Sequence, residues 1–207
     1  MMQQQLLKCC FCLVSVAFVC GSLSAASQVP LAAVDAGKGH ADDVRHADAI
    51  HNGQRDFDFD LGNWRTHSSR LLHPLTGSKD WVDMDGSTIV KKIWGGRASL
   101  AEFKSDGAAG QLQLLSLRWY NPNSRQWYLD FATPNVGKLG EVPAVGEFRN
   151  GRGDFYDRES IGGRTILLRF SIWGITADTA QSEQAFSDDG GKTWEVNWTN
   201  RYTRMSE

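Results

Sequence analysis

The region from Trp64 to Arg204 repeats one local pattern, in which a short run rich in β-branched and aromatic residues is followed by turn-forming residues. No stretch of about a dozen residues in this region keeps its apolar positions at helical spacing. The pairs Asn150-Gly151 and Gly162-Gly163 and the segment 188–191 consist of residues that adopt positive φ or cap a turn with a side chain. The region is therefore expected to be all-β, with successive strands joined as hairpins.

The pattern predicts about ten strands, and their unpaired edges must be hidden. Closure into a barrel removes the edges altogether, whereas a sandwich, the main alternative, usually needs several long crossovers. The longest irregular connection here is Pro134 to Pro143, so we predict a closed antiparallel up-and-down barrel of about 8–10 strands. The expected strands are Trp64–Leu72, Met84–Trp94, Ala98–Lys104, Gln111–Tyr120, Gln126–Ala132, Val145–Arg149, Gly153–Ser160, Arg164–Thr176, Thr179–Ser187 and Thr193–Arg204.

The first 26 residues are typical of a cleavable signal peptide. Lys8 precedes an apolar run from Cys9 to Cys20, which is too short to span a bilayer as a helix. Small residues at 24–26 fit a cleavage site before Ser27. We expect a periplasmic or secreted protein without a membrane anchor in its mature chain. All four cysteines precede the cleavage site, so no disulfide, thiolate metal site or cysteine nucleophile is expected.

Residues 27–55 are rich in Ala, Asp, Gly and His and contain no aromatic residue, which predicts a disordered leader. The folded domain is expected to span residues 57–207. The formal net charge of −2 does not suggest a nucleic-acid partner. The histidines all precede residue 74, so the later strands offer no imidazole as a haem ligand or general base; we predict no metal site and no cofactor. They are His40, His46, His51, His67 and His73.

The segment from Phe57 to Trp64, Phe-Asp-Phe-Asp-Leu-Gly-Asn-Trp, resembles the start of the first strand in lipocalin-like (calycin) barrels, where a Gly-x-Trp closes one barrel end. The rest of residues 57–207 is similar to an uncharacterised bacterial family of such barrels. The matching motifs are Arg118, Tyr120, Asn121, Arg125 and Trp127, and in the last hairpin Ser187, Asp189, Gly191, Thr193, Trp194 and Arg204. The resemblance implies a barrel, a small apolar ligand and no established reaction. It also implies that Arg204 or Arg201 stacks on Trp64.

Period-two alternation selects the candidate ligand-binding residues. Trp194, Trp198 and Tyr202 share one face of the last strand, and this face is expected to point inward. Arg118 and Arg169 alternate with apolar residues, so each is expected to be interior and to pair either with an acid or with a ligand carboxylate. The acids considered as partners are Asp130, Glu159 and Glu183. The full candidate set is Arg118, Trp119, Trp127, Tyr156, Arg169, Trp173, Trp198 and Tyr202.

Three functions are open at this point. The first is an exported carrier that holds a small hydrophobic or amphipathic molecule in the barrel. The second is an enzyme in the same cavity, of an isomerase, cyclase or decarboxylase type, that uses Tyr, Arg and carboxyl groups. The third is a carbohydrate-binding module with surface tryptophans. The segment from Ser187 to Trp194 also matches the Asp-box turn of glycan-active proteins, but it occurs once, which favours a structural turn.

Overall fold

The computed structural model describes residues 52–107 and 110–206, so the predicted signal peptide and the leader up to residue 51 lie outside the described residues. In the described part the chain forms ten strands, preceded by a 3₁₀ turn, η2 (Asp58–Asp60). A second 3₁₀ turn, η3 (Trp94–Gly96), joins β2 to β3. The strands are β1 (Gly62–Leu71), β2 (Trp81–Ile93), β3 (Ala98–Gly107), β4 (Gly110–Asn121), β5 (Gln126–Ala132), β6 (Ala144–Arg149), β7 (Arg152–Ile161), β8 (Arg164–Trp173), β9 (Thr179–Ser187) and β10 (Glu195–Arg204).

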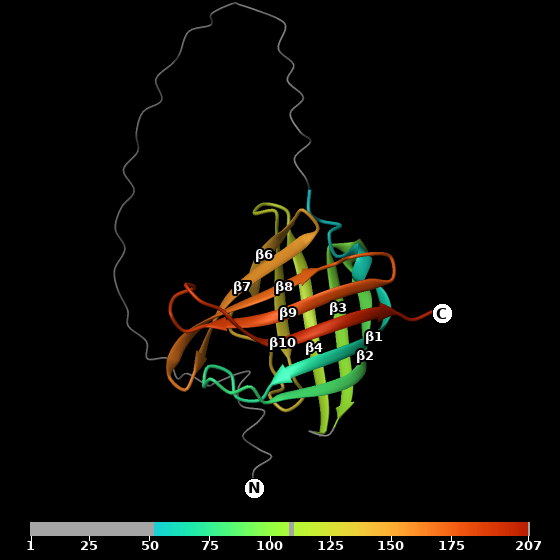
Figure 1. Cartoon of the computed structure of the whole chain (residues 1–207). Helices are drawn as coiled ribbons and strands as arrows, with labels where there is room; N and C mark the ends of the chain where they lie inside the picture. The colour runs from blue at the N-terminus through green and yellow to red at the C-terminus, as the bar shows by residue number, and fades with distance from the viewer. Residues whose placement is uncertain (1–51, 108–109, 207) are drawn as a thin grey trace, which may run out of the picture. The chain divides into compact units, whose positions relative to one another are not determined.

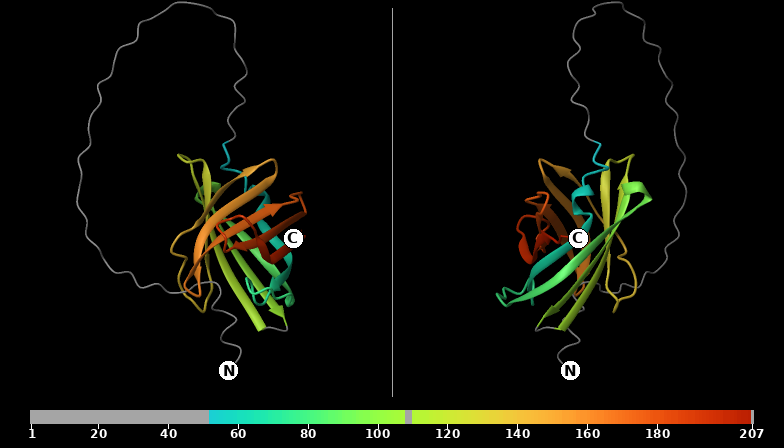
Figure 2. Two further views of the ribbon diagram at one scale, coloured as in Figure 1. Left: turned by 60° about the vertical axis from the view of Figure 1, so that its left-hand side comes forward. Right: turned by 90° about the vertical axis from the view of Figure 1, so that its right-hand side faces the viewer.

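Each strand pairs with its neighbours in the chain, and β1 pairs with β10 to close the barrel (Figure 1). All ten pairings are antiparallel, and the closing pair is in register from Trp64 opposite Arg204 to Arg70 opposite Trp198. Figure 2 shows the strands tilted around a common interior. The prediction of an all-β, closed, up-and-down antiparallel barrel is confirmed, and the sandwich alternative is wrong, because the hairpin-only connectivity leaves no strand to cross between sheets.

The residues before β1 plug one end of the barrel. Phe57 is 2% exposed and packs edge-on against Trp127 and Phe148, with ring centroids 5.0 Å away in both cases. The Trp127 indole N–H donates to the carbonyl of Gly53 at 2.8 Å. The barrel unit therefore includes Asn52 to Arg55, which composition alone places in the leader.

The tryptophan of the Gly-x-Trp segment is held by the last strand, as the resemblance implies. The Arg204 guanidinium carbon lies 4.1 Å from the centroid of the Trp64 ring, and Trp64 is fully buried. Arg204 also donates to the carbonyls of Phe59 (2.6 Å) and Leu61 (2.8 Å), which are carbonyls of the plug. The partner of Trp64 is therefore Arg204 and not Arg201, which is exposed. This contact fastens the first and last strands to the closed end.

The turn between β9 and β10 is built around Asp189. Its carboxylate accepts hydrogen bonds from Ser187 Oγ (2.8 Å), from the amide of Lys192 (2.9 Å) and from both the amide and the hydroxyl of Thr193. These bonds, those to Thr193 first, hold the pKa of Asp189 well below its usual range. Every contact is local to the turn, which supports the structural interpretation of this Asp-box-like segment.

Candidate functional site

The interior of the barrel holds a cavity of about 90 Å³, which we call the lumen cavity. Most of its lining is apolar, with Phe131 and Phe170 among the largest side chains. This volume is below the range of about 300–1,000 Å³ that is typical of drug-sized ligand pockets. It therefore suits a single-ring or short-chain molecule better than a sterol or a tetrapyrrole. The lining consists of Thr88, Ala101, Phe103, Leu114, Ser116, Arg118, Phe131, Glu159, Leu168, Phe170, Gln184, Trp198, Asn200 and Tyr202.

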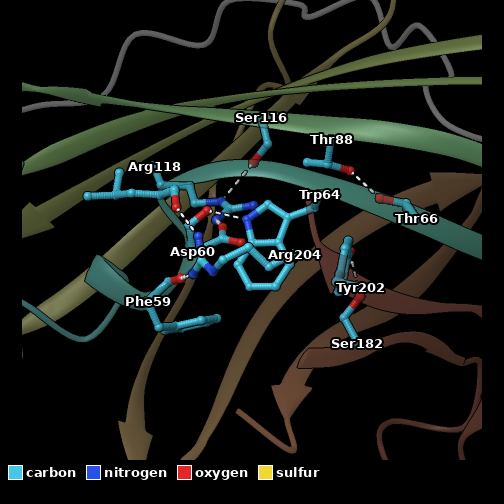
Figure 3. A network of polar contacts seen from close by, with 11 residues as sticks. Phe59, Asp60, Trp64, Thr66, Thr88, Ser116, Arg118, Ser182, Tyr202 and Arg204 are labelled. Atoms are coloured by element: carbon cyan, nitrogen blue, oxygen red, sulfur yellow. Dashed lines mark hydrogen bonds and ion pairs between the residues drawn. The ribbon is translucent and has the colours of Figure 1, made fainter. Parts of the chain in front are cut away.

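Arg118 reaches this cavity from β4 with its charge already neutralised. Its guanidinium forms an ion pair and hydrogen bond with Asp60 of the plug, and the two side chains are 9% and 6% exposed. Arg118 Nε donates to Ser116 Oγ at 3.4 Å (Figure 3). The guanidinium carbon lies 4.8 Å from the centroid of the Phe57 ring. Asp60 thus already occupies the position at the Arg118 guanidinium that a ligand carboxylate would need.

Hydroxyl groups on the neighbouring strands also bond to one another. Thr66 and Thr88 share a hydrogen bond of 2.7 Å, and the Tyr202 hydroxyl lies 3.0 Å from Ser182 Oγ (Figure 3). Burial raises the pKa of Tyr202 to about 12, so this phenol is protonated at neutral pH. Tyr202 is therefore a hydrogen-bonding group in the cavity wall rather than a base.

Asn200 connects a further set of side chains in the wall. Its amide oxygen accepts hydrogen bonds from Ser68 Oγ (2.6 Å) and from the indole N–H of Trp198 (3.0 Å). Its amide nitrogen donates to Ser182 Oγ at 3.0 Å. Because Asn200 is satisfied on both sides, this part of the lining is fixed in place.

Glu159 differs from the other polar groups of the lining. It lies on β7 on the same face as Phe155 and Asp157, and it has no hydrogen-bond or ion-pair partner among residues 52–107 and 110–206. Burial, and secondarily the nearby Asp157 carboxylate, raises the pKa of Glu159 to about 8. Burial also raises the pKa of Asp157. The lumen cavity thus contains an unpaired carboxyl group that titrates close to neutral pH.

The structure brings three of the predicted site residues together at the lumen cavity, namely Arg118, Trp198 and Tyr202. Trp127 also points inward, but it is 2% exposed and belongs to the packed cluster at the plugged end. Trp119 lies on the outer face of the barrel, where its ring stacks on Tyr128 at 5.6 Å between centroids.

Tyr156, Arg169 and Trp173 also lie on the outer face, so the interior orientation expected for Arg169 is wrong. Leu168 and Phe170, its neighbours on β8, line the cavity, and alternation turns Arg169 outward. These residues belong to a polar and aromatic cluster on the outer face of β7, β8 and β9.

In this outer cluster Arg169 donates to Glu183 at 3.1 Å and stacks on Trp194, 4.8 Å from its centroid. Arg152 stacks on Trp173 at 5.0 Å in the same way. Trp194 was expected to point inward, but it comes before β10 and before the register shift between Val196 and Trp198, so its face differs from that of Trp198. Of the two alternatives for Arg169, the structure supports pairing with an acidic residue of the chain, Glu183, and this pair lies on the outer face.

A second hollow of about 290 Å³ lies between β3, β4 and the segment from Thr133 to Gly137. Leu114 lines both this hollow and the lumen cavity.

Sequence reasoning missed Asp60 as the partner of Arg118 and treated Glu159 as a partner for a buried arginine. Asp60 lies in a 3₁₀ turn, and no periodicity in the sequence relates that turn to β4. The signal for Glu159 was present, because Asp157 and Glu159 are two residues apart on a strand and so share a face. The sequence did not show that no cationic side chain of the described residues pairs with Glu159.

Two further observations concern the described residues alone. No group of three or more His, Cys, Asp or Glu side chains within them is arranged to hold a metal ion. Nor do they include a helix with the length and hydropathy needed to cross a membrane.

Comparison with known proteins leaves the family of the chain open. No protein-family model and no curated protein matches the chain. The S-type phycobiliprotein lyase CPES from Guillardia theta is a similar solved structure, with 12% identity and a TM-score of 0.47 over 73% of this chain and 91% of that one. Another is EF1p2_mFAP2b bound to DFHBI, with 9% identity and a TM-score of 0.41 over 74% and 99% of the two chains. The fold assignment follows from the strand order of this chain.

Proposed function

We propose that this protein binds a small, largely apolar molecule inside the barrel and that it is exported. The observation that carries the binding proposal is the lumen cavity itself. It is enclosed by strands from around the barrel, and it is lined by apolar side chains with a few polar groups at fixed positions, which is the general character of small-molecule sites. The volume limits the ligand to a single ring or a short chain.

The geometry does not favour a ligand held by its carboxylate. Arg118, the guanidinium that lines the cavity, is paired with Asp60, and Arg169 is on the outer face. Glu159 would repel an anion when it is ionised. We therefore take the ligand to be neutral or cationic.

A matched pair of variants tests this proposal. Leu114→Trp puts a larger side chain into the lumen cavity and so reduces its free volume, whereas Leu117→Trp makes the same substitution on the opposite face of β4. We expect Leu114→Trp to lower the affinity for single-ring probes such as ethylbenzene and benzylamine by about tenfold or more, and Leu117→Trp to leave it unchanged. Titration followed by tryptophan fluorescence or calorimetry measures both, and circular dichroism establishes that each variant is folded. Equal affinities in the two variants would place the ligand outside the cavity.

Export is tested separately. The full chain, expressed in a bacterium with a Sec pathway, is expected to appear outside the cytoplasm with Ser27 as its first residue, which intact-mass measurement of the purified protein determines. Native mass spectrometry of the same material, followed by organic extraction, identifies any molecule that is purified with it. A cytoplasmic, unprocessed chain would contradict the export proposal and leave the binding proposal intact.

A second candidate function is an enzyme in which Glu159 acts as general acid and base. It is favoured by the position of this carboxyl group in an apolar cavity and by its pKa of about 8, because efficient proton transfer needs a group that titrates near the working pH. A turnover assay on any molecule extracted with the protein tests this candidate, and Glu159→Gln must abolish the turnover while the binding remains.

A further inference from the structure

The charged groups that face the interior of the barrel differ in whether they have a partner. Arg118 and Asp60 neutralise each other. Arg70, at the end of β1, has its guanidinium carbon 5.0 Å from the centroid of the Trp198 ring and is not part of the cavity lining. Arg204, at the end of β10, is held by Trp64 and by the carbonyls of the plug. Two further groups, Asp157 and Glu159 on β7, are both acids, and neither has an ion-pair partner in the described part of the chain.

Glu159 is the member of this set that reaches the lumen cavity. A carboxyl group taken out of water is costly to ionise, and the effective compensation is a cation held against it. The described residues place no cationic side chain in contact with Glu159, so a cation there has to come from a ligand. Asp157 lies two residues away on the same face and adds negative potential in the same direction.

The rest of the cavity suits an organic cation. Phe131, Phe170 and Trp198 line the same space, and the faces of aromatic rings attract a positive charge within about 6 Å of their centroids. The apolar side chains Leu114 and Leu168 offer a surface for a hydrocarbon body. Hydrated metal ions do not match a lining of this kind, because they prefer several oxygen ligands.

We propose that the lumen cavity selects a small amine with an apolar body, such as an arylalkylamine, and that Glu159 receives its ammonium group. This inference rests on the proposed binding function and names the chemical class of the ligand. Tyr202 and Arg118 also line the cavity, but neither offers a free charge, because Tyr202 is neutral and Arg118 is paired with Asp60.

A proton is released when such a ligand binds. Glu159 in the free protein is largely protonated at pH 7, whereas it has to be ionised against an ammonium group. Linkage then predicts that nearly one proton leaves per amine bound and that the affinity falls by about 50-fold from pH 8 to pH 6. A neutral ligand of the same shape binds without this pH dependence.

The experiment uses the folded mature protein and three probes of similar size: benzylamine, ethylbenzene and benzoate. Calorimetry at pH 8 is expected to show benzylamine binding about tenfold or more tightly than ethylbenzene, with benzoate the weakest. Repeating the benzylamine titration at pH 7 in two buffers of different ionisation enthalpy counts the released proton. Glu159→Gln is expected to lower the benzylamine affinity by about tenfold and to leave ethylbenzene unchanged.

Glu147→Gln is the matched control, since this glutamate lies on the outer face of β6 beside Arg149 and its loss should change neither affinity. Equal binding of benzylamine and ethylbenzene, or an unchanged benzylamine affinity in Glu159→Gln, overturns the amine inference while the binding proposal stands. If none of the three probes binds, both proposals fail.

Discussion

Two carboxyl groups that face the interior of the barrel, Asp60 at the plugged end and Glu159 in the lumen cavity, have opposite surroundings. Asp60 is 4% exposed and is paired with Arg118, and the plug around it is tied by the bonds of Trp64 and Arg204. Glu159 is partly buried and has no partner in the described part of the chain. The closed end thus satisfies the charges that it buries, whereas the cavity leaves one unsatisfied. The closed end of the barrel is therefore stabilised by paired charges, whereas the unpaired Glu159 carboxyl group destabilises the interior when it is ionised.

The largest effect is expected at the closed end. Asp60→Ala leaves the Arg118 charge buried without its partner, which should lower the free energy of unfolding by about 3–5 kcal/mol. Urea denaturation at neutral pH measures this loss. The control is Asp58→Ala, whose ion pair is with the exposed Arg55 and should contribute less than about 1 kcal/mol to the free energy of unfolding. Similar losses in the two variants would mean that water reaches Arg118.

Removal of the Glu159 carboxyl group is expected to have the opposite effect, because it should raise the free energy of unfolding at pH 8. Its pKa is raised from 4.5 to about 8, so between these values the folded protein binds more protons than the unfolded chain. The stability due to this group is present below pH 4.5 and is lost as the pH rises to 8, by up to about 1.4 kcal/mol per unit. Glu159→Gln should remove this slope and be more stable than the natural protein at pH 8. Urea denaturation at pH 5.5, 7 and 8 tests this expectation, and an unchanged slope in the variant would contradict it.

A smaller effect is expected where the last strand meets the plug. Arg204→Ala removes the stack on Trp64 and the hydrogen bonds to Phe59 and Leu61, and should lower the free energy of unfolding by about 2 kcal/mol. Affinity for lumen probes should not change, because Arg204 does not line the cavity. Thermal denaturation compares it with Arg201→Ala on the exposed face, expected within about 0.5 kcal/mol of the natural protein. An equal loss from both variants would remove the special role of Arg204.

The smallest effect is expected on the outer face. Arg169→Ala breaks a partly exposed ion pair with Glu183 and a stack on Trp194, so it should cost about 1 kcal/mol or less. Its affinity for lumen probes should equal that of the natural protein. A binding defect in Arg169→Ala would show that the outer cluster, and not the interior, contacts the ligand.

The strands and the barrel closure could be predicted because they follow from local chemistry. Alternating apolar residues and the Gly-containing turns place each strand within a few residues of its observed bounds, and hairpin connections allow one order of strands. Alternation also placed Trp198 and Tyr202 inside. It failed for Arg169, because both faces of β8 carry apolar residues and each could be taken for the interior one. It failed for Trp194, because the register shift in β10 changes the face between residues 194 and 198.

The amino-acid sequence by itself determined the fold class and the ten hairpin-linked strands, whereas the stacking of an arginine of the last strand on Trp64 was implied by the resemblance to lipocalin-like barrels. The fold class and the strands could be determined because they depend on residue types a few positions apart and on a closing rule that hides strand edges. Tertiary structure alone decided the charge pattern of the interior. Asp60 and Arg118 are 58 residues apart in the chain, and their pairing leaves Glu159 unpaired. No local pattern records which charges meet across a barrel, because pairing depends on distances that exist once the barrel is closed.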